Sequence, residues 1–231
     1  MSKITIPSKD GKSFNAYIAM PEVTPAPCVI VIQEIFGIIK GIREKCDWLA
    51  SEGFIACAPD LFWRIEPGIE LSDQVPKELQ RAFELFGLFN VDKGIEDIKA
   101  VIHTLKGHAK STGKVGALGY CLGGKLAYLS ACRTNINASI GYYGVGIEDM
   151  LAEANNIKGN IILHIAEEDG FVPPDAQKKI HEGLEENPHV TLHSYPLVDH
   201  AFTRVGGDNY NEEAAQIADT RSINFLKKYL G

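Results

Sequence analysis

The feature that most constrains the fold is a series of short, uninterrupted apolar runs separated by helical patterns. The runs "CVIVIQ" and "IILHIA" contain almost no alternating polar positions, which is typical of strands buried on both faces. Between such runs, apolar residues recur every three or four positions, as Ile42, Cys46 and Leu49 do. Buried strands that alternate with helices predict an α/β fold with a mostly parallel central sheet and helices on both faces.

The chain begins with a different signal, in which Asp10-Gly11 separates two short alternating runs and predicts a β-hairpin. The strands are expected at 4–7, 14–19, 28–34, 54–58, 115–118, 138–142, 160–165 and 190–195. Helices are expected at 40–53, 77–88, 91–105, 123–132 and 175–184, followed by a last helix ending at Tyr229, while 61–75 is irregular. The spacing in the last helix predicts one buried face made of Ala214, Ile217, Ala218, Ser222, Phe225, Leu226 and Tyr229.

Composition limits the class of protein. The 231 residues are 45% hydrophobic and 23% charged, without repeats or a linker, which predicts a single globular domain over 1–231. The net charge of −7 and the scattered basic residues argue against a nucleic-acid partner. The chain has no signal-peptide core and no run long enough to span a membrane, so a soluble, cytoplasmic protein is expected.

The five cysteines form no CxxC pair, and the apolar settings of Cys28 and Cys57 predict buried free thiols. The cysteines and histidines also lack zinc spacing, and no glycine-rich phosphate-binding motif is present. We therefore expect neither a metal nor a cofactor.

Cys121 differs from the other cysteines because of the segment "KVGALGYCLGGKL" around it. A buried strand, the pattern G-x-C-x-G and a helix form the context in which a nucleophile is held on a sharp turn. Gly119 and Gly123 leave room where the strand and helix backbones approach each other. The amide of Leu122 would then lie at the helix start and could stabilise an oxyanion. The alternative is that Cys121 is a packed core thiol.

A cysteine nucleophile of this kind needs a base and an acid that orients the base. His200 follows the run "VTLHSY" and Asp169 follows "IILHIA", so both lie where the carboxyl ends of parallel strands meet. Spacing alone does not separate Asp169 from the neighbouring acids Glu167, Glu168 and Asp175. His164 and His193 fall inside strands, where a hydrogen-bonded, partly buried histidine is expected rather than a base.

These residues carry a resemblance to the dienelactone hydrolases (carboxymethylenebutenolidases), cysteine hydrolases with the α/β-hydrolase fold. The matching segments are collinear and cover nearly the whole chain: "VIVIQEIFG", "CAPDLF", "GKVGALGYCLGGKLAY", "GYYGVG", "EDGFVP" and "DHAFTR". The resemblance implies a triad of Cys121, His200 and Asp169. It also implies that Glu34 lies beside the nucleophile and accepts the thiol proton when substrate binds, and that the amide of Ile35 joins that of Leu122 in the oxyanion hole.

The substrate implied by the resemblance is a dienelactone, a small lactone with a carboxylate, which is opened to maleylacetate through an acyl-enzyme on Cys121. Arg204 matches one of the two arginines that bind the carboxylate in the family. The second has no direct match, because Leu79 takes its place and Arg81 comes two residues later, where a solvated surface position is equally expected. Phe83 replaces a tyrosine of some members, and Tyr142 is expected to form a pocket wall.

Two alternatives remain open from the sequence. The same triad could serve a broader hydrolase of small esters or thioesters, in which case Arg81 would have no role. A non-catalytic protein that binds a small ligand is the other alternative, although such a protein has no need of a complete set of Cys121, His200, Asp169 and Glu34. We expect a monomer or a weak dimer.

Overall fold

The computed structural model describes residues 2–231. The chain divides into two compact units, the first ending at Gly116 and the second running from Ala117 to Gly231. Each unit combines strands with helices, as the alternating pattern predicted. That the whole chain forms one domain stays a prediction.

The sheet of the first unit contains four strands in the order β1 (Lys3–Pro7), β2 (Ser13–Ala19), β4 (Ile55–Pro59) and β3 (Ala26–Ile32). The expected hairpin is confirmed, since β1 and β2 pair antiparallel with Ile6 opposite Phe14. Gly11 has a φ of 81° in its turn, a value that a glycine adopts without strain. β3 and β4 pair in parallel, and their residues are almost all buried.

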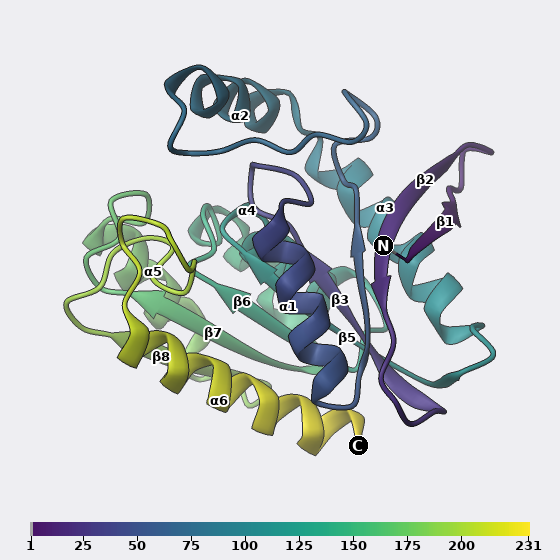
Figure 1. Cartoon of the computed structure of the whole chain (residues 1–231). Helices are drawn as coiled ribbons and strands as arrows, with labels where there is room; N and C mark the ends of the chain where they lie inside the picture. Colours follow the sequence, from purple (N-terminus) through teal and green to yellow (C-terminus); the bar gives the residue numbers. More distant parts are fainter. Residues whose placement is uncertain (1) are drawn as a thin grey trace. The chain divides into compact units, whose positions relative to one another are not determined.

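Three helices belong to this unit: α1 (Lys40–Ser51), α2 (Pro76–Leu88) and α3 (Val91–Lys106). α1 packs against β4 and buries Ile42, Cys46 and Leu49, the face that the sequence predicted. Figure 1 shows α1 in front of the strands and α3 behind them. Helices therefore cover both faces of this sheet, which explains why β3 and β4 are apolar at every position.

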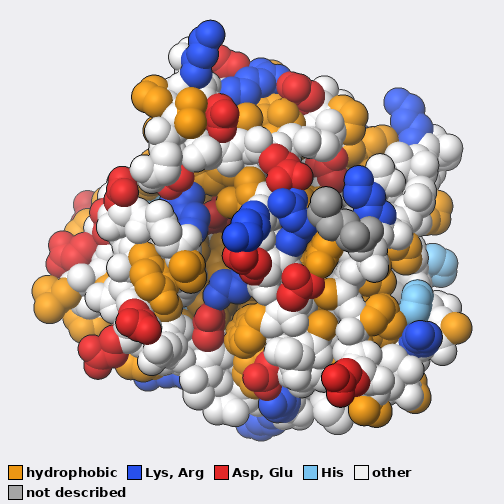
Figure 2. Space-filling model, viewed as in Figure 1, with side chains coloured by type: hydrophobic (Ala, Val, Ile, Leu, Met, Phe, Trp, Pro, Cys, Tyr) orange, Lys and Arg blue, Asp and Glu red, His pale blue; other side chains and the backbone are white. Residues whose placement is uncertain are grey.

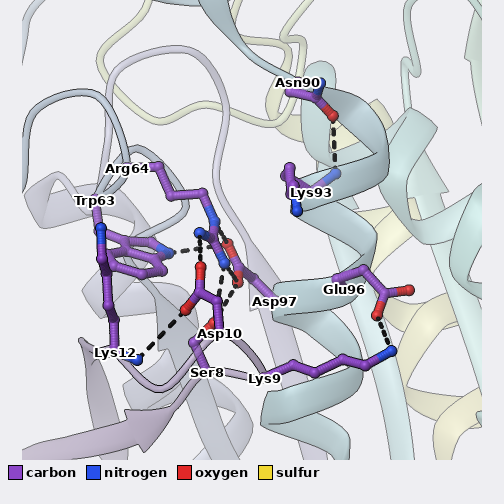
Figure 3. A network of polar contacts seen from close by, with 10 residues as sticks. All are labelled: Ser8, Lys9, Asp10, Lys12, Trp63, Arg64, Asn90, Lys93, Glu96 and Asp97. Atoms are coloured by element: carbon purple, nitrogen blue, oxygen red, sulfur yellow. Dashed lines mark hydrogen bonds and ion pairs between the residues drawn. The ribbon is translucent and has the colours of Figure 1, made fainter.

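The irregular segment after β4 is held by a buried carboxylate, Asp97 of α3, as Figure 3 shows. The guanidinium of Arg64 donates to Asp97 Oδ2 at 2.8 Å and to Oδ1 at 2.7 Å, and Trp63 Nε1 donates to Oδ2 at 2.9 Å. Arg64 also reaches Asp10 in the hairpin turn at 2.5 Å. The network fastens the segment to α3 and to the hairpin, since a buried carboxylate is tolerated only when it is paired and hydrogen-bonded.

The second unit contains the parallel strands β6 (Ala138–Tyr142), β7 (Asn160–Ala166) and β8 (Val190–Tyr195), in that order. β5 (Ser111–Tyr120) runs from the first unit into the second. α4 (Leu122–Arg133) packs on β6, and α5 (Pro174–Leu184) packs on η1 (Glu148–Asn156), a 3₁₀ helix that the sequence pattern did not predict. α6 (Glu212–Leu230) lies in front of these strands (Figure 1).

The predicted buried face of α6 is partly wrong. Ile217 is 41% exposed, and the buried residues are Ala215, Ala218, Ser222, Ile223, Phe225, Leu226 and Leu230. The centre of the face is correct, but its edges are rotated by one residue. The alanines at 214 and 215 are interchangeable in a hydrophobic pattern, so the sequence could not place the edge.

Acidic and basic side chains are interspersed on the face seen in Figure 2, as the scattered basic residues of the sequence suggested. Across residues 2–231, no helix combines the length and apolar character needed to cross a bilayer. No group of three or more His, Cys, Asp or Glu side chains in the described chain is arranged to hold a metal ion.

Candidate active site

Cys121 lies at the turn between β5 and α4, with a φ of 55° and a ψ of −115°. Residues other than glycine rarely adopt this backbone conformation, and such backbone strain is typical of residues held in place for a functional reason. The Cys121 amide donates to Tyr142 O at 3.0 Å, and the Cys121 carbonyl accepts from Gly124 N at 3.0 Å. The turn is thus fixed on both sides of the sulfur-bearing residue, as the G-x-C-x-G pattern predicted.

Gly119 is required by the closeness of strand and helix at this turn. A Cβ atom at position 119 would lie 2.0 Å from the carbonyl oxygen of Gly123, and backbone atoms at both positions leave no room for adjustment. We expect Gly119→Ala to destabilise the protein by roughly 3 kcal/mol or more, measured by urea unfolding. Gly87→Ala in α2 is the control, because a Cβ there meets nothing within 4 Å. Equal stability of the two variants would contradict this account of the turn.

The amide of Leu122 is the first of α4. The first amides of a helix have no intrahelical acceptor, and they lie at the positive end of the helix dipole. An oxygen that gains negative charge beside Cys121 can therefore be stabilised there. This is the arrangement expected of an oxyanion hole.

His200 and Asp169 form a buried pair. His200 Nδ1 lies 2.9 Å from Asp169 Oδ2 and 3.1 Å from Oδ1, and the two residues are 7% and 3% exposed. Cys121 is also a hydrogen-bond partner of His200. Because Nδ1 faces the carboxylate, Nε2 remains for the sulfur. The structure thus brings Cys121, His200 and Asp169 together in the order thiol, imidazole, carboxylate.

Two residues that the sequence did not single out hold the loops of this pair. The Gln177 side-chain amide donates to the carbonyl oxygens of Ala166, Glu167 and Val172, at 3.1, 3.2 and 2.7 Å. Asp199 Oδ1 accepts from the amides of Gly170 and His200, at 3.0 and 2.6 Å. Asp199 thereby links the loop of the acid to the loop of the histidine. Its place directly before His200 was the one available signal in the sequence.

Aromatic rings enclose the imidazole. The rings of Tyr143 and Phe171 meet His200 edge to face, with centroids 5.0 and 4.8 Å away. The predicted pocket wall, Tyr142, is instead fully buried, and its hydroxyl bonds Ser222 and Asp219. The prediction was displaced by one residue because β6 ends at Tyr142, so that the next tyrosine turns out of the strand with a φ of 38°.

The setting of His200 favours its protonated form. Burial alone would lower its pKa, but hydrogen bonds to Asp169 and Cys121, together with the charges of both, raise the pKa of His200 to about 10. The imidazole therefore carries a proton at neutral pH. A positive charge beside the sulfur stabilises the anionic form that attacks a carbonyl, which is how cysteine nucleophiles are generally activated.

This raised pKa makes stability depend on pH. The folded value of about 10 lies above the ordinary 6.5, so the contribution of His200 is complete below pH about 6.5 and is lost as the pH rises through about 10. We expect the stability difference between the wild type and His200→Gln to shrink over that window, by a few kcal/mol at the most. Urea unfolding at several pH values measures it. A constant difference from pH 6.5 to 10 would contradict the assignment.

Five further predicted site residues have defined local settings. In the first unit, Glu34 and Ile35 follow β3 and are 4% and 5% exposed. Arg81 on α2 donates to Glu66 at 2.7 Å and to Glu84 at 2.9 Å, and Phe83 on the same helix is 44% exposed. In the second unit, the amide of Arg204 donates to Ala201 O at 2.9 Å, closing the turn that follows His200.

Comparisons with known proteins identify the family of the chain. The model of the dienelactone hydrolase family matches residues 14–230. A putative carboxymethylenebutenolidase of Azospirillum brasilense is 41% identical over the full length of both chains. A carboxymethylenebutenolidase of Pseudomonas putida is 37% identical, with 96% of this chain and 94% of the relative covered.

A solved structure of a putative dienelactone hydrolase from Klebsiella pneumoniae superposes with a TM-score of 0.88 at 28% identity, covering 99% of this chain and 98% of the other. That likeness and the elements described above establish the α/β-hydrolase fold that the sequence predicted. With the match to the family model over nearly its whole length, the chain belongs to the dienelactone hydrolase family, whose members are carboxylic ester hydrolases.

Proposed function

We propose that this protein hydrolyses a dienelactone to maleylacetate through an acyl-enzyme on Cys121. The observation that carries the proposal is the Cys121–His200–Asp169 arrangement on a strained turn at the start of a helix. The relatives named carboxymethylenebutenolidase supply the substrate class. Each group then has a role that its setting supports.

In the first step, the Cys121 sulfur attacks the lactone carbonyl carbon, and the carbonyl oxygen gains negative charge near the Leu122 amide. The carbon–oxygen bond of the ring then breaks, leaving a thioester on Cys121 and an enolate that takes the proton of His200. Acylation removes the charge on sulfur, which is one of the causes that raise the pKa of His200. His200 is then neutral and can accept a proton from the water that hydrolyses the thioester.

Glu34 and Ile35 complete the proposed machinery on the basis of the family resemblance. Ile35 would supply a second amide to the oxyanion, and Glu34 would accept the thiol proton when substrate binds. The burial of the Glu34 carboxylate after β3 is consistent with a functional role, because burying a charged group is costly unless it is paired or hydrogen-bonded. The roles of both residues stay predictions.

A carboxylate on the substrate needs a cation, and Arg204 is the proposed one because it ends the turn that follows His200. We expect Arg204→Gln to raise KM for dienelactone about tenfold or more, since charged hydrogen bonds contribute roughly 1.5–3 kcal/mol, with little change for a neutral ester such as p-nitrophenyl acetate. Ultraviolet-monitored hydrolysis of both substrates measures this. Arg133→Gln is the control, because Arg133 pairs with Glu153.

Arg81 decides between this function and a second candidate, a broader hydrolase of small esters. Its guanidinium is already occupied by Glu66 and Glu84, and this observation favours the second candidate. If Arg81→Gln and Arg204→Gln both leave dienelactone hydrolysis unchanged while Cys121 remains essential, neither arginine binds the substrate carboxylate and the broader hydrolase is favoured. A loss with either variant supports the carboxylate-bearing lactone.

A further inference from the structure

A chain of hydrogen bonds crosses the interior of the second unit and ends at the half-buried Asp219 and the exposed Arg221, in a set of polar residues that the proposed chemistry does not use. It contains Tyr142 of β6, His164 of β7, Tyr195 of β8, and Asp219, Arg221 and Ser222 of α6. His164 and Ser222 are 1% and 0% exposed. The sequence predicted only that His164 would be a satisfied, partly buried histidine.

The distances connect these side chains without a gap. Arg221 Nη1 lies 3.1 Å from the Tyr195 hydroxyl, which lies 2.8 Å from His164 Nδ1. His164 Nε2 lies 3.0 Å from Ser222 Oγ, and Ser222 Oγ lies 2.6 Å from the Tyr142 hydroxyl. The Tyr142 hydroxyl lies 3.0 Å from Asp219 Oδ1.

The two ends of this chain determine the direction of every bond in it. The carboxylate of Asp219 accepts, so Tyr142 uses its proton there and its oxygen accepts from Ser222. Ser222 oxygen must then accept from His164, which places a proton on Nε2. At the other end Arg221 can only donate, so the Tyr195 oxygen accepts from it and the Tyr195 proton points at Nδ1.

This direction leaves His164 a single state, neutral with its proton on Nε2. A second proton on Nδ1 would oppose the Tyr195 proton and would add a positive charge near Arg221. The pKa of His164 is indeed lowered well below its ordinary value by burial and by His193 and Arg221. The His193 ring stacks on His164, with the ring centroids 5.8 Å apart, but His193 is not a member of this hydrogen-bond chain.

The backbones of the same residues hold the candidate active site. His164 O accepts from the amide of Tyr143 at 2.8 Å, and Tyr142 O accepts from the amide of Cys121 at 3.0 Å. The Tyr143 ring packs on His200. The carbonyl of Tyr195 accepts from Glu167 N at 3.0 Å, at the start of the loop that carries Asp169.

We propose that His164 is a positioning residue, held as the neutral Nε2–H tautomer by a one-directional hydrogen-bond chain from Arg221 to Asp219. The chain fixes the side chains at the ends of β6, β7 and β8, whose backbone carbonyls in turn hold Cys121, Tyr143 and the loop of Asp169. The effect on rate rests on the proposed function, whereas the tautomer does not.

The tautomer is measured by long-range ¹H–¹⁵N NMR of the imidazoles, with His164→Gln used to assign the signal. We expect one protonated and one unprotonated nitrogen, the proton on Nε2, unchanged between pH 5.5 and 8.5. A proton on Nδ1, or titration of His164 within this pH range, would overturn the proposed direction of the hydrogen-bond chain. This result is independent of whether the protein hydrolyses any ester.

The positioning role is measured by the kinetics of Tyr195→Phe, His164→Leu and His164→Gln. We expect Tyr195→Phe and His164→Leu to lower kcat about tenfold at unchanged KM, because the attacking groups are misplaced while the substrate contacts remain. Glutamine supplies one donor and one acceptor, so His164→Gln should recover most of the loss. His193→Gln, outside the chain, should retain the wild-type kcat.

Two results would overturn the positioning role. The first is a wild-type kcat in folded Tyr195→Phe and His164→Leu. The second is an equal loss in His164→Leu and His164→Gln, because a merely space-filling role would not distinguish an amide from an alkyl group. Absence of Cys121-dependent hydrolysis in the wild type, with the expected tautomer, would reject the proposed function and leave the hydrogen-bond chain intact.

Discussion

Replacing Cys121 with alanine is expected to reduce kcat/KM for lactone and ester hydrolysis by on the order of 10⁴-fold or more. This corresponds to at least about 5.5 kcal/mol of lost transition-state stabilisation. The variant keeps the turn but removes the atom that attacks the carbonyl. Alanine is preferred to serine, because a hydroxyl beside His200 could still act as a nucleophile.

Cys132 provides a matched control for this experiment. It lies in the last turn of α4, whereas Cys121 directly precedes the helix, and the two are 8% and 9% exposed. Burial raises the pKa of Cys132 to about 11, despite its bond to Tyr128, so its thiol stays neutral and unreactive at physiological pH. We expect Cys132→Ala to retain kcat/KM within about twofold and to lose only a small packing contribution.

Mass spectrometry of the enzyme quenched during turnover of a slow ester gives a second readout. The acyl group is expected on the peptide that contains Cys121, and no adduct is expected on Cys132. Hydrolysis that persists in Cys121→Ala at more than about a hundredth of the wild-type rate would rule out the acyl-enzyme on this residue. It would also revive the hypothesis of a non-catalytic protein with a contaminating activity.

Much of this candidate site could be predicted from the sequence because the residues with catalytic chemistry each follow a predicted strand. The apolar runs before Cys121 and Asp169 are continuous, and the strand before His200 is apolar at Val190, Leu192 and Tyr195. All three residues were therefore expected to follow strands, and parallel strands end at one edge of a sheet. The glycines around Cys121 predicted a sharp turn, and the structure gives the reason: at Gly119 the backbones of strand and helix are too close for a Cβ atom. These signals are local, and local signals can be read from a sequence.

The remainder depended on contacts between distant segments. Sequence spacing could not distinguish Asp169 from its acidic neighbours as the acid of the triad. In the structure, Asp169 is buried and bonds His200 Nδ1. Likewise, Tyr142 and Tyr143 are adjacent and both buried, but β6 ends between them, so that Tyr142 bonds Ser222 and Asp219 while the Tyr143 ring packs on His200. Gln177 was missed because its bonds go to backbone atoms of another segment, which leave no pattern in the sequence, and Asp199 offered only its place directly before His200.

The assignment of the acid leads to the second large effect. Asp169→Asn is expected to lower kcat/KM by roughly 10³- to 10⁴-fold, as when the acid of a comparable triad is converted to its amide. An asparagine amide that faces His200 Nδ1 donates a proton, which forces the imidazole to carry its own proton on Nε2. That nitrogen can then no longer accept a proton from the water that hydrolyses the thioester.

The fold should survive this substitution, which makes the loss interpretable. Asp169 Oδ1 accepts from the amide of Phe171 at 2.8 Å, and an asparagine oxygen can keep that bond. We therefore expect urea unfolding to show a change of no more than about 2 kcal/mol. Dienelactone and a neutral ester should lose activity equally, because the acid acts on the nucleophile rather than on the substrate carboxylate.

Glu168→Gln is the matched control, since it removes the same charge one residue earlier from an exposed side chain. Its kcat/KM should stay within about twofold of the wild type, because exposed charges contribute little. If Glu168→Gln caused the large loss and Asp169→Asn did not, the acid would be misassigned. The buried pair with His200 would then be structural, and the raised pKa of His200 would need another catalytic explanation.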